Sequence, residues 1–243
     1  MKTCQTTPLD NFKLSPQVTW GDKIANCKGI LGTAGCLAYL RKSGEPVILS
    51  AWHVMFGKGA VINDKVWLAR QFRECHSVTE VGKVVAGKIG NIWYHNWEVY
   101  VDCAISTFTL NNYQVLTTVV EGYGEAFIGD SVYKIGAATG MTKGIVIKHP
   151  HFDKACIEGN TVLAKSQLLI RSKNGIPFSS NGDSGSVILN MENKVVGLLW
   201  GTNCWGEGLA CPIAPVMSML NIEFNASPEL NAGSSQLTAQ KFK

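Results

Sequence analysis

The sequence predicts an all-β protein, either a sandwich or a barrel, whose strands fall into two groups. Short runs rich in β-branched residues recur along the 243-residue chain, and many of its 25 glycines stand between them. Hydrophobic residues make up 46% of the chain and charged residues 16%, which is typical of a well-buried globular protein. Because helical periodicity is rare between these runs, helical fold classes are not favoured.

The strands can be placed in order along the chain. Residues 36–55 read as strand, turn and strand, with the turn over 43–46. Further strand-like runs lie at 80–89, 100–110, 130–138, 144–149 and 161–172, and residues 186–201 form a hairpin that turns at 190–193. One helix is expected in 214–222, since Pro215 suits a first turn and Val216, Met219 and Leu220 share a face. The expected organisation is an arm over 1–26, β units over 27–120 and 121–224, and a flexible tail over 225–243.

Charge and cysteine content exclude several classes of function. The net charge is +4 and the basic residues are dispersed, so neither nucleic acid nor a membrane surface is an expected partner. The eight cysteines include no pair with zinc-knuckle spacing, and we expect neither a metal nor another cofactor. The first residues lack the apolar core of a signal peptide, which predicts a cytoplasmic protein with reduced thiols. The oligomeric state stays open.

The stretch NGDSGS, residues 181–186, raises the question of catalysis. Gly182 and Gly185 allow backbone conformations that a side chain would forbid, so the amides of Gly182 and Ser184 can point at one spot. Such a pair of donors forms an oxyanion hole. Ser184 would then be a nucleophile, provided that a base removes its proton.

The candidate base and its orienting acid lie earlier in the chain. All five histidines precede Ser184, so the order is histidine-first or acid-first, and the α/β-hydrolase order is excluded. His53 follows the apolar run PVILSAW; a half-buried histidine at a strand end is the alternative interpretation. Asp102 lies inside an apolar run, where a carboxylate needs a partner such as an imidazole N–H or a turn that it caps.

These motifs resemble those of the chymotrypsin-like serine peptidases. SAWHV, VDCAI and GDSGS look like the histidine, aspartate and serine motifs of that superfamily. Together with KIGAATGMTKGIV and VVGLLWG, they resemble most closely the bacterial trypsin-like peptidases related to the plant narrow-leaf proteins. The resemblance covers most of residues 30–222 and implies two packed antiparallel β-barrels with the site between them. It also implies His53 as general base, Asp102 as its orienter and Ser184 as nucleophile.

The same resemblance implies where a peptide would bind. Leu199, Trp200 and Gly201 look like the strand that pairs with an extended substrate backbone. Phe178 takes the position that sets specificity in trypsins, which predicts an apolar pocket beside Gly201 rather than a preference for Arg or Lys. Leu199 also replaces a serine that often supports the buried aspartate, and the partner of Asp183 is not identified.

Two functions remain in competition. One is a serine endopeptidase that acts on peptides or proteins through an acyl-enzyme intermediate. The other is a protease-fold module that binds extended peptides and cleaves them weakly. A purely structural role would not explain why Asp102 lies in an apolar run or why the chain contains the NGDSG motif.

Overall fold

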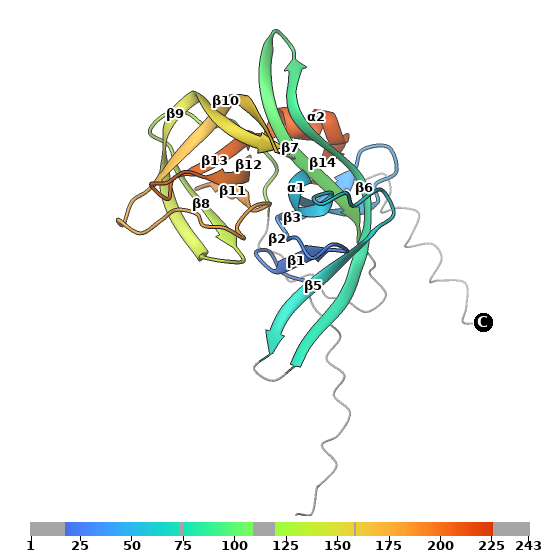
Figure 1. Cartoon of the computed structure of the whole chain (residues 1–243). Helices are drawn as coiled ribbons and strands as arrows, with labels where there is room; N and C mark the ends of the chain where they lie inside the picture. Colours follow the sequence, from blue (N-terminus) through green and yellow to red (C-terminus); the bar gives the residue numbers. More distant parts are fainter. Residues whose placement is uncertain (1–17, 73–74, 109–119, 158, 226–243) are drawn as a thin grey trace, which may run out of the picture.

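The computed structural model describes residues 18–72, 75–108, 120–157 and 159–225, and these form two β units (Figure 1). The strands of each unit pair antiparallel. The predicted all-β architecture of two antiparallel units is therefore confirmed: one unit is a closed barrel and the other is an eight-stranded sheet.

The N-terminal unit is an eight-stranded sheet in the order β14-β3-β4-β7-β6-β5-β1-β2. The Gly35 amide, in the link between β2 and β3, donates to Leu49 O on β4 at 2.9 Å and extends the β3–β4 pairing. The strands are β1 (Lys23–Asn26), β2 (Leu31–Thr33), β3 (Cys36–Leu40), β4 (Pro46–Ser50), β5 (Lys65–Phe72), β6 (Cys75–Tyr94), β7 (Trp97–Thr107) and β14 (Ile222–Glu223).

The C-terminal unit is a closed six-stranded barrel in the order β10-β13-β12-β11-β8-β9. Its strands are β8 (Ser131–Gly136), β9 (Gly140–Ile157), β10 (Asn160–Ser172), β11 (Val187–Asn190), β12 (Val195–Thr202) and β13 (Gly208–Pro212). The predicted hairpin over 186–201 is the β11–β12 pair. Its turn includes Asn193 at φ 58°, a conformation that asparagine tolerates well.

Two helices accompany the strands. The predicted C-terminal helix is α2 (Ile213–Leu220), and it ends in a left-handed cap at Asn221. The other helix, α1 (Trp52–Met55), is a single turn where the sequence predicts a strand end. Strand β4 stops at Ser50, so His53 lies on this short helix.

The described ends of the chain join the N-terminal unit. Strand β1 lies within the segment predicted as an arm and pairs with both β2 and β5. Strand β14 pairs with β3 although it follows the whole C-terminal barrel. The predicted tail over 225–243 lies outside the described residues apart from Asn225, and the domain boundaries remain a prediction.

The hydrophobic core joins the two units. The largest buried cluster contains side chains of both, including Leu49, Val101, Leu198 and Val216. Two smaller clusters lie within the N-terminal unit and within the C-terminal barrel. Because apolar burial dominates folding free energy, this shared core fixes the two units against each other.

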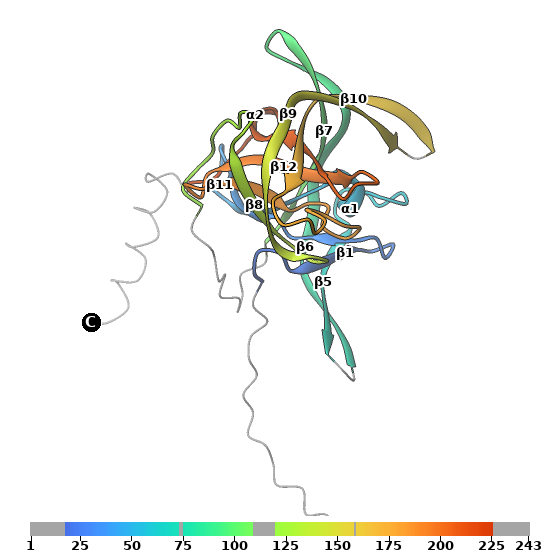
Figure 2. The same ribbon diagram turned by 90° about the vertical axis from the view of Figure 1, so that its left-hand side faces the viewer.

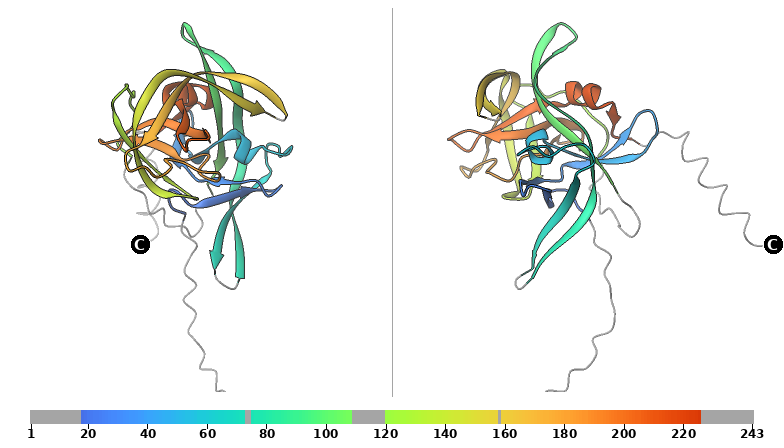
Figure 3. Two further views of the ribbon diagram at one scale, coloured as in Figure 1. Left: turned by 60° about the vertical axis from the view of Figure 1, so that its left-hand side comes forward. Right: turned by 45° about the vertical axis from the view of Figure 1, so that its right-hand side comes forward.

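Three long hairpins extend from this core. The β5–β6 and β6–β7 hairpins project from opposite sides of the N-terminal unit (Figure 1), and the β9–β10 hairpin reaches from the barrel toward β7 (Figures 2 and 3). Asn91 Nδ2 donates to Leu163 O at 2.8 Å, and Ser166 Oγ donates to Glu98 O at 2.8 Å. These bonds tie the barrel to the β6–β7 hairpin.

Candidate active site

His53 and Asp102 are in direct contact. His53 Nδ1 lies 2.7 Å from Asp102 Oδ2, and the backbone amide of His53 donates to Asp102 Oδ1 at 3.1 Å. The carboxylate therefore holds both the ring and the main chain of the histidine. Asp102 is 2% exposed, so the hydrogen bonds offset a burial that would otherwise be costly.

This contact fixes what the imidazole can do. With Nδ1–H donating to the carboxylate, Nε2 is the unprotonated nitrogen and can accept a proton. Burial lowers the pKa of His53, but the charge of Asp102 and its hydrogen bond outweigh burial and raise the pKa above the ordinary value. A positive imidazolium is therefore stabilised here.

The Ser184 loop packs directly on the segment that carries His53. The Thr33 amide donates to Ser184 O at 2.8 Å, and Thr33 Oγ1 donates to Gly182 O at 2.8 Å. Gly185 has φ 94°, and a Cβ there would overlap Ser50 Oγ and lie 2.5 Å from Thr33 O. Only glycine fits this position, which brings the loop against the β4–α1 junction.

The Ser184 side chain points along β12. Its hydroxyl donates to Trp200 O at 3.3 Å. Among the residues that the structure describes, no hydrogen bond joins this hydroxyl to the His53 ring. A rotation about the Cα–Cβ bond would be needed to redirect it.

Two amides near the hydroxyl have no partner within the described part of the chain. They belong to Gly182, at φ 103°, and to Ser184. Three amides beside them are engaged: Asp183 N donates to Ser180 O, Gly185 N to Leu199 O and Ser186 N to Asp183 O. Backbone donors are rarely left unpaired, so this pair is available to an anionic or carbonyl oxygen.

A buried ion pair stabilises the loop that carries Ser184. Lys134 on β8 and Asp183 both have side chains with no solvent exposure, and Lys134 Nζ lies 3.1 Å from Asp183 Oδ2. Asp183 also accepts hydrogen bonds from the Ala138 and Thr139 amides, from Thr139 Oγ1 and from the Ser180 amide. Lys134 is therefore the partner of Asp183, which the sequence alone does not identify.

A hollow of about 330 Å³ adjoins the His53–Asp102 pair. Three aromatic side chains, those of Trp52, Tyr100 and Trp200, line it, and the rings of Tyr100 and Trp200 lie 5.0 Å apart. The exposed thiol of Cys156, on the β9–β10 hairpin, lies at the same hollow. The lining residues are Trp52, His53, Gly57, Lys58, Ile89, Tyr100, Asp102, Ala155, Cys156 and Trp200.

Other residues expected to contact a peptide differ in their exposure. Phe178 and Leu199 are 0% and 1% exposed and pack in the barrel core, so the pocket expected around Phe178 is not formed by its side chain. The Leu199 backbone is also occupied, because its amide donates to Ser186 O and its carbonyl accepts from Gly185 N. Trp200 and Gly201 lie beyond the start of β11, where that edge of β12 has no partner strand in the described chain.

Three contributors to the site were missed from the sequence. Lys134 resembles an ordinary solvent-facing strand residue, and Thr33 is one threonine among many. Gln167 is fully buried; it donates to Tyr100 O at 2.9 Å and accepts from Trp200 Nε1 at 2.6 Å. Their partners lie in distant segments, and no local pattern points to them.

Comparison with solved structures defines the class of fold. The chain superposes on Thermobifida fusca protease A with a TM-score of 0.60 and 17% identity, over 87% of this chain and 100% of that one. For Cellulomonas bogoriensis chymotrypsin the TM-score is 0.55 and the identity 16%, over 87% of this chain and 100% of that one. For Nocardiopsis protease the TM-score is 0.57 and the identity 18%, over 86% of this chain and 100% of that one. The fold is that of the chymotrypsin-like serine proteases.

A narrower relationship comes from the sequence itself. Residues 112–209 match the family described as the Nal1 C-terminal domain, which agrees with the resemblance to the narrow-leaf proteins. No curated protein matches the chain. A helix long and apolar enough to cross a membrane is absent from the residues that the structure describes.

Proposed function

We propose that this protein is a serine endopeptidase in which His53, Asp102 and Ser184 form the catalytic triad. The observation that carries the proposal is the double hold of Asp102 on His53, through the ring and through the backbone amide. It leaves Nε2 as the free basic atom, on a helix that begins at the β4–α1 junction against which the Ser184 loop packs. A histidine buried for structural reasons alone does not need this orientation.

The reaction would proceed by two acyl transfers. As Ser184 Oγ attacks the peptide carbonyl carbon, His53 Nε2 takes the hydroxyl proton, and the carbonyl oxygen gains a negative charge. The amides of Gly182 and Ser184 would stabilise this oxyanion. His53 then returns the proton to the leaving amine, which departs as the C–N bond breaks. Water then attacks the ester carbonyl carbon while His53 takes its proton, and His53 returns this proton to Ser184 Oγ as the C–Oγ bond breaks and the carboxylic acid product leaves.

Two features support a peptide as the substrate. The free edge of β12 at Trp200 and Gly201 offers main-chain groups to an extended chain. The aromatic hollow beside His53 can take a side chain that neighbours the bond to be cleaved. A carbonyl held at the two free amides would then lie next to Ser184.

The competing proposal is a module that binds peptides without cleaving them efficiently. It is favoured by the hydrogen bond from Ser184 Oγ to Trp200 O, which directs the hydroxyl away from His53. Unligated enzymes often show long or misaligned catalytic hydrogen bonds that tighten when substrate binds. We therefore favour the endopeptidase.

Covalent labelling separates the two proposals. A fluorophosphonate probe should label the wild-type protein, and labelling should disappear in Ser184→Ala and fall steeply in His53→Gln. Ser218→Ala, which changes an exposed serine on α2, is the matched control and should label normally. An unlabelled wild type that still binds peptides would favour the binding module and sink the endopeptidase.

A further inference from the structure

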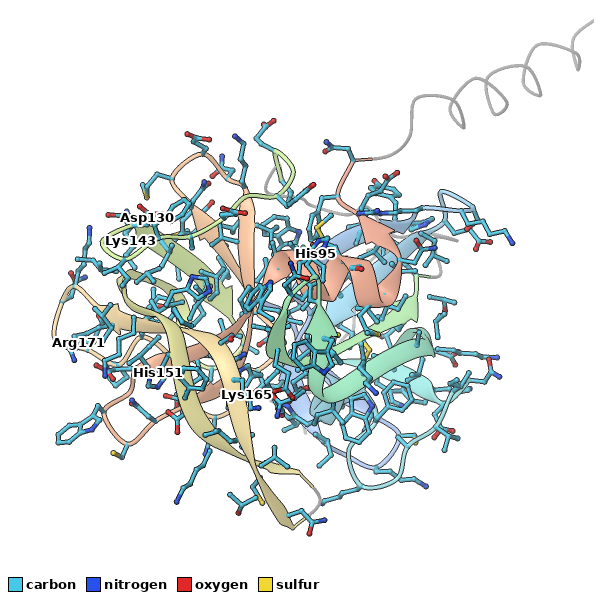
Figure 4. The ribbon with its side chains drawn as sticks, turned by 90° about the horizontal axis from the view of Figure 1, so that it is seen from above. His95, Asp130, Lys143, His151, Lys165 and Arg171 are labelled. Atoms are coloured by element: carbon cyan, nitrogen blue, oxygen red, sulfur yellow. The ribbon has the colours of Figure 1, made fainter. Side chains whose placement is uncertain are left out.

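A second hollow lies on the C-terminal barrel, lined by residues other than those around His53. Its volume is about 320 Å³, and it opens between the end of β10 and the turn over 203–206. Figure 4 shows Arg171 at the outer side of the barrel. The lining residues are Arg171, Ser172, Gly175, Ile176, Trp205, Gly206 and Glu207.

The turn that forms one wall is held rigidly. Asn203 Oδ1 accepts hydrogen bonds from the amides of Trp205 and Glu207, each at 3.0 Å, and the Gly206 amide donates to Asn203 O. Gly206 has φ 71°, and a Cβ there would lie 2.7 Å from Pro177 Cβ. The two walls of the hollow are thus packed together before any ligand arrives.

This rigid turn presents apolar side chains to solvent. Trp205 is 81% exposed and Ile176 is 56% exposed, and both line the hollow. A tryptophan on an ordered turn loses little entropy on binding and supplies a large apolar area. Such a residue is typical of an anchor for a partner.

A single cation, Arg171, and a single anion, Glu207, line the hollow. Arg171 Nε donates to Glu207 Oε1 at 2.6 Å, and Asn203 Nδ2 donates to Glu207 Oε2 at 2.8 Å. Both carboxylate oxygens of Glu207 are therefore engaged, while the Arg171 side chain remains 64% exposed. Burial raises the pKa of Glu207, but the hydrogen bonds from Asn203 and Arg171 and the nearby positive charges outweigh burial and hold the pKa below its ordinary value. A further carboxylate would find the guanidinium available.

The hollow is connected to the Ser184 loop. Gly206 O accepts hydrogen bonds from the amides of Phe178 at 2.8 Å and Ser179 at 3.3 Å. Thr202 Oγ1 also donates to Ser179 O at 3.2 Å. A chain bound at the turn over 203–206 would therefore lie next to the segment that leads into Gly182.

We propose that this hollow docks a peptide segment in which an acidic side chain adjoins an aromatic one. The carboxylate would bind the terminal nitrogens of Arg171, and the aromatic ring would pack between Trp205 and Ile176. This docking site goes beyond the proposed hydrolysis and does not depend on it. It would select partners by a motif separate from the bond that is cleaved.

Binding can be measured without hydrolysis in full-length Ser184→Ala protein. The probes are fluorescein-labelled glycine-rich hexapeptides with Glu-Phe, Gln-Phe or Glu-Ser at the centre, followed by fluorescence anisotropy. Glu-Phe should bind on the order of tenfold more tightly than either other peptide. Arg171→Gln should abolish the preference for Glu over Gln, and Trp205→Ala should abolish the preference for Phe over Ser.

Matched controls make the outcome decisive. Trp93→Ala removes another exposed tryptophan, at 73% exposure, and Lys42→Gln removes another exposed cation; neither should change the affinities. The proposal is overturned if no probe binds at millimolar concentration, or if the Glu preference survives Arg171→Gln. Binding that is lost in Trp52→Ala but kept in Trp205→Ala would place the probe beside His53 and would also overturn it.

Discussion

Replacing Lys134 with methionine should destabilise the protein far more than the loss of an ordinary ion pair. Methionine has a similar length but no charge, so Asp183 would remain ionised and buried without its cation. Removing one partner of a buried pair costs about 3–5 kcal/mol. The hydrogen bonds that Asp183 accepts from the 138–139 turn and from Ser180 would remain. We therefore expect a destabilisation near the lower end of this range. A loss of about 3 kcal/mol is roughly a hundredfold in the folding equilibrium.

Urea unfolding followed by tryptophan fluorescence measures this loss. The transition midpoint should fall while its denaturant slope stays constant, since the folded state is otherwise unchanged. Lys194→Met is the matched control, because Lys194 pairs with Glu192 at 2.7 Å on the surface, and it should leave the midpoint nearly unchanged. The double variant Lys134→Met/Asp183→Asn should be less destabilised than the sum of the two single variants.

The same experiment has a pH dependence with a definite sign. Burial raises the pKa of Asp183, but the hydrogen bond from Thr139 and the charge of Lys134 outweigh it and hold the pKa below its ordinary value. Asp183 therefore contributes stability above the ordinary aspartate pKa, and this contribution is lost as the pH falls through the folded-state pKa. Lys134→Met should weaken that acid-side loss. A cost no larger than that of Lys194→Met would refute the reasoning.

Three further predictions concern the site itself. The acid limb of kcat/KM should have a midpoint above pH 6.5, because Asp102 raises the pKa of His53, and Asp102→Asn should abolish the activity rather than only move the limb. Gly185→Ala should destabilise the fold by about 2 kcal/mol or more in urea unfolding, since its positive φ and close packing leave no room for Cβ; wild-type stability would contradict this. Gln167→Leu should remove the hydrogen-bond partner of the Trp200 N–H and a donor to Tyr100 O, at a cost of about 1–3 kcal/mol in stability. Peptide titrations should then show weaker binding. An unchanged affinity would argue against a role of Gln167 in positioning Trp200.

The sequence predicted those parts of the structure that have local signals. Alternating β-branched runs predicted the strands, and Pro215 with its apolar face predicted α2. The one-turn helix α1 is too short to show a helical period, so His53 was assigned to a strand end. The cost of burying a carboxylate predicted that Asp102 needs a hydrogen-bond partner, and the resemblance to the chymotrypsin-like peptidases indicated His53 as that partner.

What could not be predicted depends on pairing between distant segments. Lys134 occupies a strand where any long polar side chain would be unremarkable, and only the closed barrel reveals its burial against Asp183. The role expected for Phe178 rested on a register of loops that the sequence does not specify. In the structure, its ring fills space between Gly144 and Gly208, and a Cβ at either glycine would lie within 3 Å of it.

The bonds of Thr33 have a consequence for any large motion of the molecule. Thr33, in the N-terminal unit, donates hydrogen bonds to the carbonyls of Gly182 and Ser184, which flank Asp183. Its hydroxyl also accepts a hydrogen bond from the Ala137 amide at 3.0 Å. A hinge motion that separates the two units would break these bonds and would move His53, the proposed base, away from Ser184, the proposed nucleophile. Regulation by a hinge motion between the two units would therefore abolish the proposed hydrolysis, whereas a small rearrangement within the Ser184 loop would keep the hydrogen bonds of Thr33.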